Sequence, residues 1–98
     1  MGISIIIPAY NEEKFISNTI QSITTRMPPH YQYEIIVVDH GSSDETVALA
    51  SSVGAIVIDG SHLKTIAALR NLGVKNSSGR IFIGPRPLVK TMHFSARL

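Results

Sequence analysis

Side chains that can bind a ligand follow two apolar segments of the sequence. Asp39 comes directly after the apolar run 35–38, and Tyr10 and Glu12 come shortly after the apolar run 3–7. A carboxylate in this position can accept hydrogen bonds from a ligand, or it can cap its own loop, and both alternatives stay open. Tyr10 offers a flat ring that can stack on a base, or it is an ordinary aromatic residue of a loop.

Two further features can bind an anion. Arg70 lies in a predicted helix and can pair with a phosphate, although a solvated place on the helix surface is the commoner role. The turn 41–43, Gly-Ser-Ser, precedes another predicted helix and can hold an anion, although such a turn more often only caps its helix. The glycine fingerprint of dinucleotide-binding proteins, the Walker-type loop and the Gly-x-Ser-x-Gly motif do not occur, and the four histidines lack metal-ligand spacing.

Strands that alternate with helices must position these residues. The predicted strands are 3–7, 33–39, 55–58 and 80–83. Pro8 is expected to end the first strand, because proline cannot donate to the ladder. The first helix is predicted to have Asn11 as its N-cap, and its apolar stripe consists of Ile16, Ile20, Ile23 and Met27.

The two later helices have their own signals. Ser42 and Glu45 fit a capping box at the start of the second helix, and Val47 and Ala50 are expected on its inner face. The third helix is predicted from about residue 63 to residue 75. The alternation indicates an α/β fold with an open, mostly parallel sheet, and the continuous apolar strands favour helices on both faces. In such sheets ligands bind at the carboxyl ends of the strands.

The composition restricts the class of protein. The 98 residues make one domain at most, 44% are hydrophobic, and there is no cysteine. No run reaches the roughly 18 apolar residues of a membrane helix, and no signal-like segment begins the chain, so a cytoplasmic protein is expected. Residues 1–59 hold all seven acids and two bases, which sum to −5, and residues 60–98 hold seven bases, which sum to +7. The bases are scattered without interleaved aromatic residues, so a nucleic-acid partner is not expected.

Three motifs occur in sequence along the chain. They are 3–13 (ISIIIPAYNEE), 34–46 (EIIVVDHGSSDET) and 68–73 (ALRNLG). Together they resemble the start of the family 2 glycosyltransferases, which have the GT-A fold, over about residues 3–83. The chain therefore looks like the first, nucleotide-binding half of such a domain, a truncated Rossmann-like GT-A unit.

The resemblance implies a site for a nucleotide-diphosphate sugar, with a UDP-sugar as the first candidate. The loop that matches Pro8, Ala9, Tyr10 and Glu12 would border the nucleoside, with the Tyr10 ring near the base. The carboxylate that matches Asp39 would hydrogen-bond the base, and Arg70 would lie by the nucleotide. Stacking, one acceptor and one cation suit a nucleotide physically.

The chain also departs from the family pattern. His40 stands where the family usually has a second aspartate, and no acid follows Asp59. The family's Asp-x-Asp, which holds Mg²⁺ or Mn²⁺ in a complete member, is therefore not matched, and no catalytic base is identified. We expect no metal cofactor in this chain and no sugar transfer by the chain alone. The alternatives are a non-catalytic nucleotide-binding α/β module and an oligomeric interaction domain.

The last segment, 84–98, differs from the rest of the chain. It is basic, contains two prolines and shows no clean helix or strand period. We therefore divide the chain into a glycosyltransferase-like region, 1–83, and an irregular tail, 84–98. A shifted reading frame or a truncated gene would explain the change at residue 84, and the rival is a genuine small paralogue with its own tail. A sheet that ends at its fourth strand leaves an open edge, so a homo-oligomer is expected.

Overall fold

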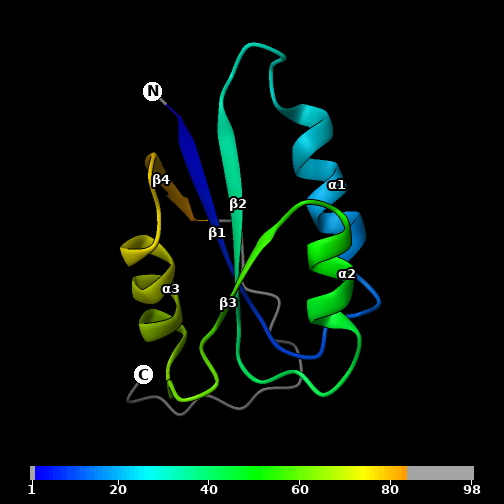
Figure 1. Ribbon diagram of the computed structural model, residues 1–98, viewed down its shortest axis with the longest axis vertical. Coiled ribbons are helices and arrows are strands. Elements are labelled where there is room, and N and C mark those ends of the chain that lie inside the picture. The colour runs from blue at the N-terminus through cyan, green and yellow to red at the C-terminus, as the bar shows by residue number, and fades with distance from the viewer. Residues whose placement is uncertain (1, 84–98) are drawn as a thin grey trace.

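Four parallel strands form one open sheet in the order β3-β2-β1-β4. The computed structural model describes residues 2–83, and the predicted tail 84–98 lies outside the described residues. The strands are β1 (Ile3–Ala9), β2 (Tyr33–Asp39), β3 (Ile56–Asp59) and β4 (Arg80–Ile83). The helices are α1 (Ile16–Arg26), α2 (Thr46–Ser52) and α3 (Ile66–Lys75). The alternating order of strands and helices is visible in Figure 1 and confirms the predicted α/β class.

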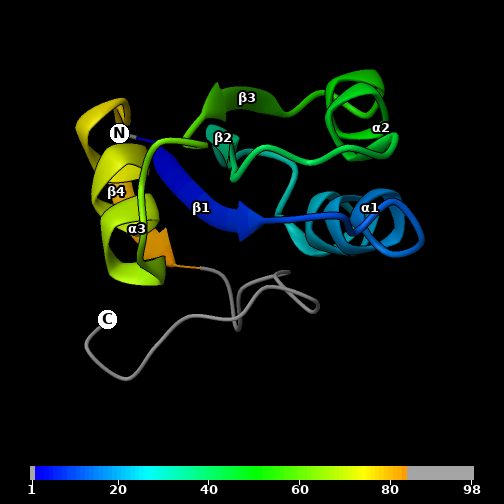
Figure 2. The same cartoon turned by 90° about the horizontal axis from the view of Figure 1, so that it is seen from below.

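Helices cover both faces of the sheet, as the continuous apolar strands predicted. In Figure 2, α1 and α2 lie on one side of the sheet and α3 lies on the other. The core under α1 and α2 consists of Ile5, Ile7, Ala9, Ile16, Ile20, Ile35, Val37 and Ala50. The core under α3 consists of Ile6, Ile36, Val38 and Leu69. Alternate residues of β1 and β2 therefore supply two separate cores, because successive side chains of a strand point to opposite faces.

Strand β1 runs two residues beyond its predicted end. Pro8 pairs with Val38, and Ala9 pairs with Asp39. The Ala9 carbonyl accepts from the His40 backbone N–H of the β2 side, at 2.9 Å, so the nitrogen of Pro8 faces the opposite side. On that side the described pairs with β4 end at Ile6. The missing donor of Pro8 therefore interrupts no described ladder bond, and the predicted stop at this residue is wrong.

The first two helices begin later than predicted. Helix α1 starts at Ile16, and Asn11 has a φ of 49°, which is the left-handed region and not an N-cap conformation. Helix α2 starts at Thr46, with no capping bond from the side chain at its N-cap, and Val47 is 39% exposed instead of facing the core. The apolar stripe of α1 is confirmed, with two buried members and two that pack against them. The start signals were misread because the residues involved make contacts between loops, as described below.

Candidate functional site

The carboxyl ends of β1 and β2 lie level with each other. Ala9 pairs with Asp39, so the next residues, Tyr10 and His40, begin two neighbouring loops. We name residues 10–15 the first loop, residues 40–45 the second loop and residues 60–65, which follow β3, the third loop. All three loops lie at the end of the sheet that Figure 2 views, where open parallel sheets bind ligands.

Asp39 forms hydrogen bonds to the second loop, which is itself hydrogen-bonded to the first. Its Oδ2 accepts from the Ser42 backbone N–H at 2.9 Å, and its Oδ1 accepts from the Ser42 hydroxyl. The Ser42 oxygen in turn accepts from the Asn11 backbone N–H at 2.8 Å. Asp39 is only 5% exposed, so the structure contains the loop-capping contact that position alone left as one of two alternatives. Each carboxylate oxygen has two lone pairs, so these bonds do not exhaust its capacity to accept from a ligand.

The side chain of Asn11 makes another hydrogen bond between the first loop and the second. Its side-chain oxygen accepts from the Ser43 backbone N–H at 2.8 Å. Its φ of 49° is a conformation that asparagine tolerates better than most residues, and it turns the chain sharply after β1. The backbone N–H groups of Ser42 and Ser43 both donate to protein acceptors, so the turn 41–43 joins the two loops. This differs from the cap on its own helix that the sequence favoured, because the N-cap of α2 is Glu45.

Further hydrogen bonds join the two loops just before the helices that follow them. The backbone N–H of Glu12 donates to the Thr46 hydroxyl at 2.8 Å, and that of Glu13 donates to Asp44 Oδ2 at 3.2 Å. In return, the Glu45 N–H donates to Glu13 Oε1 at 3.1 Å. The first N–H group of each helix is satisfied within its own segment, Ile16 by the Glu12 carbonyl and Thr46 by Asp44. The predicted capping box of Ser42 and Glu45 is wrong, because the Ser42 side chain bonds Asp39 and the first loop instead. Contacts between two loops cannot be found by a spacing of three residues within one segment.

Asp44 is a carboxylate that accepts hydrogen bonds from both loops. Desolvation works to raise the pKa of its carboxyl, but hydrogen bonds from the hydroxyl and the backbone N–H of Thr46 outweigh it, and the pKa is lowered. The Thr46 N–H bond to Asp44 measures 2.9 Å. Asp44 therefore stays ionised at neutral pH and serves as an acceptor for both loops.

Tyr10 meets the second loop through its ring. The rings of Tyr10 and His40 lie edge to face, with centroids 5.9 Å apart and planes at 73°. The His40 Nε2 makes a hydrogen bond to the Leu63 carbonyl of the third loop. Asp59, at the end of β3, has a lowered pKa because of hydrogen bonds from Ser61, with smaller contributions from nearby histidines that include His40. His40 thus links the ring of Tyr10 to the third loop.

Arg70 lies on α3, one turn after the helix begins. Its Nε is buried and has no hydrogen-bond partner among the residues that the structure describes. A buried guanidinium donor without an acceptor is unfavourable, and a ligand phosphate would satisfy it. The contacts that join Tyr10 and Asp39 run through the second loop and do not involve Arg70.

The other predicted site residues are buried. Pro8 and Ala9 lie inside β1, and their side chains are inaccessible. Glu12 is 3% exposed, and its carbonyl accepts from the N–H groups of Phe15 and Ile16 at 3.0 and 2.9 Å. Of the predicted set, only Tyr10 and Arg70 have side chains of intermediate exposure. Pro8, Ala9 and Glu12 thus support the edge of the sheet from within.

Sequence reasoning missed the parts played by Asn11, Ser42 and His40 in joining the loops. For Asn11 a signal was present, because asparagine next to a strand end often takes a left-handed conformation. The reading as an N-cap was preferred because two glutamates follow it. For His40 no pattern within the sequence points to a carbonyl 23 residues away.

The described residues do not provide a metal centre. In residues 2–83 no group of three or more His, Cys, Asp or Glu side chains could hold a metal ion. No acidic residue follows Asp59 in the sequence. The Asp-x-Asp ligands that the resemblance implied for Mg²⁺ or Mn²⁺ therefore have no counterpart in the sequence after Asp59, and residues 2–83 do not fit that metal. Among the same residues, no helix is long and apolar enough to cross a membrane.

Comparisons of the sequence with known proteins point to one family. The sequence pattern of the family described as "Glycosyl transferase family 2" matches residues 4–84. Glycosyltransferase AglE of Haloferax volcanii is 36% identical over 85 residues, which cover 81% of this chain and 28% of AglE. The 4,4'-diaponeurosporenoate glycosyltransferase of Staphylococcus aureus is 46% identical over 58 residues, which cover 59% of this chain and 15% of that enzyme. The chain thus spans less than a third of the length of either relative.

Proposed function

Because the chain belongs to glycosyl transferase family 2, we propose that its carboxyl-edge loops bind the nucleotide of a nucleotide-diphosphate sugar. A UDP-sugar is the first candidate. The observation that carries the proposal is the level pairing of Ala9 with Asp39, which brings the loop that begins at Tyr10 next to Asp39 at the edge where such sheets bind ligands. An aromatic face and an acceptor can recognise a base together.

Arg70 supports the phosphate part of the proposal. Its buried Nε has no acceptor among the described residues, and a diphosphate would provide one. Pro8, Ala9 and Glu12 act in this proposal by keeping the end of β1 in place, because their side chains are buried. The second loop is held by its own hydrogen bonds before any ligand arrives, so little ordering is needed on binding.

Calorimetric titration with UDP, UDP-sugars and other nucleotides tests the proposal, with and without Mn²⁺. We expect binding that Tyr10→Ala weakens about tenfold, since base stacking contributes roughly 1–3 kcal/mol. Tyr31→Ala is the matched control, because Tyr31 is 48% exposed and its ring meets only His30 among the described aromatic residues. Arg70→Gln should also weaken binding, and Lys75→Gln, at the other end of α3, should not. A chain that binds no nucleotide under either condition would refute the proposal.

We propose that the chain by itself binds the nucleotide sugar and does not transfer the sugar. The sequence has no acid after Asp59, so the ligands for a metal that would stabilise a departing diphosphate are not supplied. No general base for an acceptor hydroxyl is identified either. We expect no turnover in a coupled transfer assay with the purified chain. Measured turnover would overturn this part and leave the nucleotide-binding part standing.

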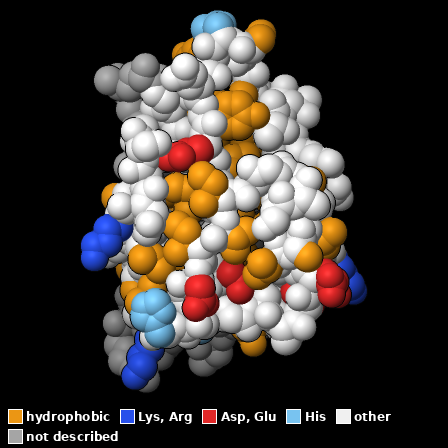
Figure 3. Space-filling model, in the orientation of Figure 1, with side chains coloured by type: hydrophobic (Ala, Val, Ile, Leu, Met, Phe, Trp, Pro, Cys, Tyr) orange, Lys and Arg blue, Asp and Glu red, His pale blue; other side chains and the backbone are white. Residues whose placement is uncertain are grey.

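Self-association in the cytoplasm completes the proposal. Strand β3 is an edge of the described sheet, and Ile56 on it is 48% exposed. Figure 3 shows hydrophobic side chains gathered along the face on which β3 lies. An open strand edge with apolar side chains favours pairing with another chain. Light scattering should give a dimer or larger assembly at micromolar concentration, and a monomer would contradict it.

A further inference from the structure

The His40 side chain occupies the meeting point of three loops. Its ring lies edge to face with Tyr10 of the first loop, at a centroid distance of 5.9 Å. Its Nε2 bonds the Leu63 carbonyl of the third loop, and its own backbone begins the second loop. The His40 N–H also donates to the Ala9 carbonyl at 2.9 Å, which keeps this point of the chain against β1.

The chemistry of these contacts sets the orientation of the ring. A carbonyl oxygen only accepts, so the His40 Nε2 carries the proton in this contact. A hydrogen bond on one nitrogen and a packed ring edge together leave the imidazole little rotational freedom. The Tyr10 ring then lies at 73° to a ring with little freedom to turn. Edge-to-face packing of this kind has a preferred angle, so His40 can define the angle of Tyr10.

We propose that His40 is the positioning residue that holds the Tyr10 ring ready to stack on the base of the donor, and that it ties this ring to the third loop. The inference rests on the proposed function for its ligand, although the contact itself does not. The aspartate that family 2 enzymes usually have at this position could neither donate to the Leu63 carbonyl nor present an aromatic edge. Histidine at this position makes both contacts.

A ligand-free experiment tests the contact directly. The sequence has three tyrosines and no tryptophan, so the Tyr31→Phe/Tyr33→Phe background leaves Tyr10 as the sole strongly fluorescent side chain. Both replaced tyrosines are exposed, at 48% and 37%, so this background should fold. In it we expect His40→Leu to lower the fluorescence anisotropy of Tyr10. His62→Leu, a change at an exposed histidine of the third loop, should leave the anisotropy unchanged.

Two conservative variants separate positioning from a merely structural role. His40→Phe keeps a ring beside Tyr10 and loses the donor to Leu63, whereas His40→Gln keeps a donor and loses the ring. We expect His40→Phe, which keeps the ring and so one of the two restraints, to retain most of the anisotropy of Tyr10 and to bind UDP within about threefold of the parent. His40→Gln and His40→Leu should lose the anisotropy and bind UDP about tenfold more weakly.

The outcomes distinguish this inference from the proposed function. Unchanged Tyr10 anisotropy in His40→Leu would overturn the positioning role. Variants whose affinity for UDP does not fall together with the Tyr10 anisotropy would overturn it as well. An equal loss of affinity in His40→Phe and His40→Gln, with equal loss of thermal stability, would show a structural role only. If the parent chain binds no nucleotide, the proposed function fails, while the fluorescence comparison still decides whether His40 holds the ring.

Discussion

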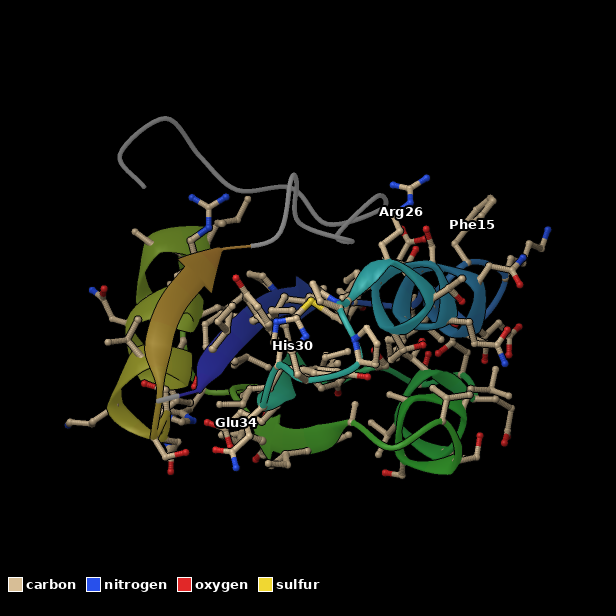
Figure 4. All side chains as sticks on the ribbon, turned by 90° about the horizontal axis from the view of Figure 1, so that it is seen from above. Phe15, Arg26, His30 and Glu34 are labelled. Atoms are coloured by element: carbon tan, nitrogen blue, oxygen red, sulfur yellow. The ribbon has the colours of Figure 1, made fainter. Side chains whose placement is uncertain are left out.

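The two ends of the sheet each gather hydroxyl and amide donors around one carboxylate. At the amino end, Glu34 Oε2 accepts from the Ser4 hydroxyl at 2.6 Å and from the Ser78 N–H at 2.9 Å. The Ser4 oxygen then accepts from the Gly79 N–H at 3.0 Å. Glu34 lies at the start of β2 in Figure 4, which views this end of the sheet. At the carboxyl end, Asp39 does the same for Ser42.

The difference lies in what each carboxylate joins. Glu34 ties β1 and β2 to the turn that enters β4, so its bonds join parts of the scaffold. Asp39 ties loops together, and beside it lie a partly exposed ring at Tyr10 and a histidine that contacts a third loop. A carboxylate with many donors is therefore not a site by itself. The partly exposed ring and the histidine near Asp39 distinguish the carboxyl end from the purely structural cluster at Glu34.

The largest expected loss of stability is at the amino end of the sheet. A Cβ at Gly79 would lie 2.6 Å from the Gly2 carbonyl oxygen and 3.0 Å from the Ile3 nitrogen, and both of these neighbours are backbone atoms. Gly79→Ala should reduce the free energy of unfolding by about 3 kcal/mol, the upper part of the range for overpacking, because backbone cannot rotate away. Urea unfolding followed by circular dichroism measures it.

Gly54→Ala is the control for this change. Gly54 has a φ of 94° and nothing within 4 Å of a Cβ, so only backbone strain of about 1 kcal/mol is expected. Equal losses for the two variants would mean that the amino end is not closely packed around Gly79.

The next effect contrasts the two carboxylates directly. In Asp39→Asn, the amide nitrogen would face one of the two Ser42 donors, so we expect about 2 kcal/mol less stability and at least tenfold weaker UDP binding. Glu34→Gln keeps an oxygen where Oε2 lies, so about 1 kcal/mol is expected there and no change in UDP affinity. Titration calorimetry and urea unfolding on both variants provide the test. A loss of UDP affinity in Glu34→Gln would erase the distinction between the two ends.

A smaller effect depends on pH. Hydrogen bonds from the Ser4 side chain and then from the Ser78 backbone lower the pKa of the Glu34 carboxyl in the folded chain. The stability that this provides is fully present above the ordinary glutamate pKa, about 4.3, and is lost as the pH falls through the folded value. In Glu34→Gln, the free energy of unfolding should therefore fall less steeply as the pH is lowered. Asp44 and Asp59, whose pKa values are also lowered, should maintain the rest of the slope. A slope identical to the parent's would contradict the shift at Glu34.

The sequence predicted the parallel sheet and its two covered faces because these follow from patterns of neighbouring residues. The apolar run at 35–38 and the stripe from Ile16 to Met27 are local signals of burial. The positions of Asp39 and Tyr10 followed from the end of each strand. The hydrogen bonds between the two loops did not, because Glu12 and Thr46 lie 34 residues apart and nothing in either segment identifies its partner. Local capping rules were applied to side chains that instead make contacts between loops.

The smallest difference to be resolved concerns Asn11, where strain and hydrogen bonding can be separated. Asn11→Ala removes the acceptor of the Ser43 N–H and also puts a residue that tolerates the left-handed region less well than asparagine at a φ of 49°, so about 2 kcal/mol is expected. Asn11→Gly removes the same acceptor but relieves the backbone, so the loss should be about 1 kcal/mol. The difference between the variants measures the strain, and the loss common to both measures the bond between the loops. Thermal unfolding gives both values, and equal losses for alanine and glycine would show that the left-handed turn after β1 carries no strain.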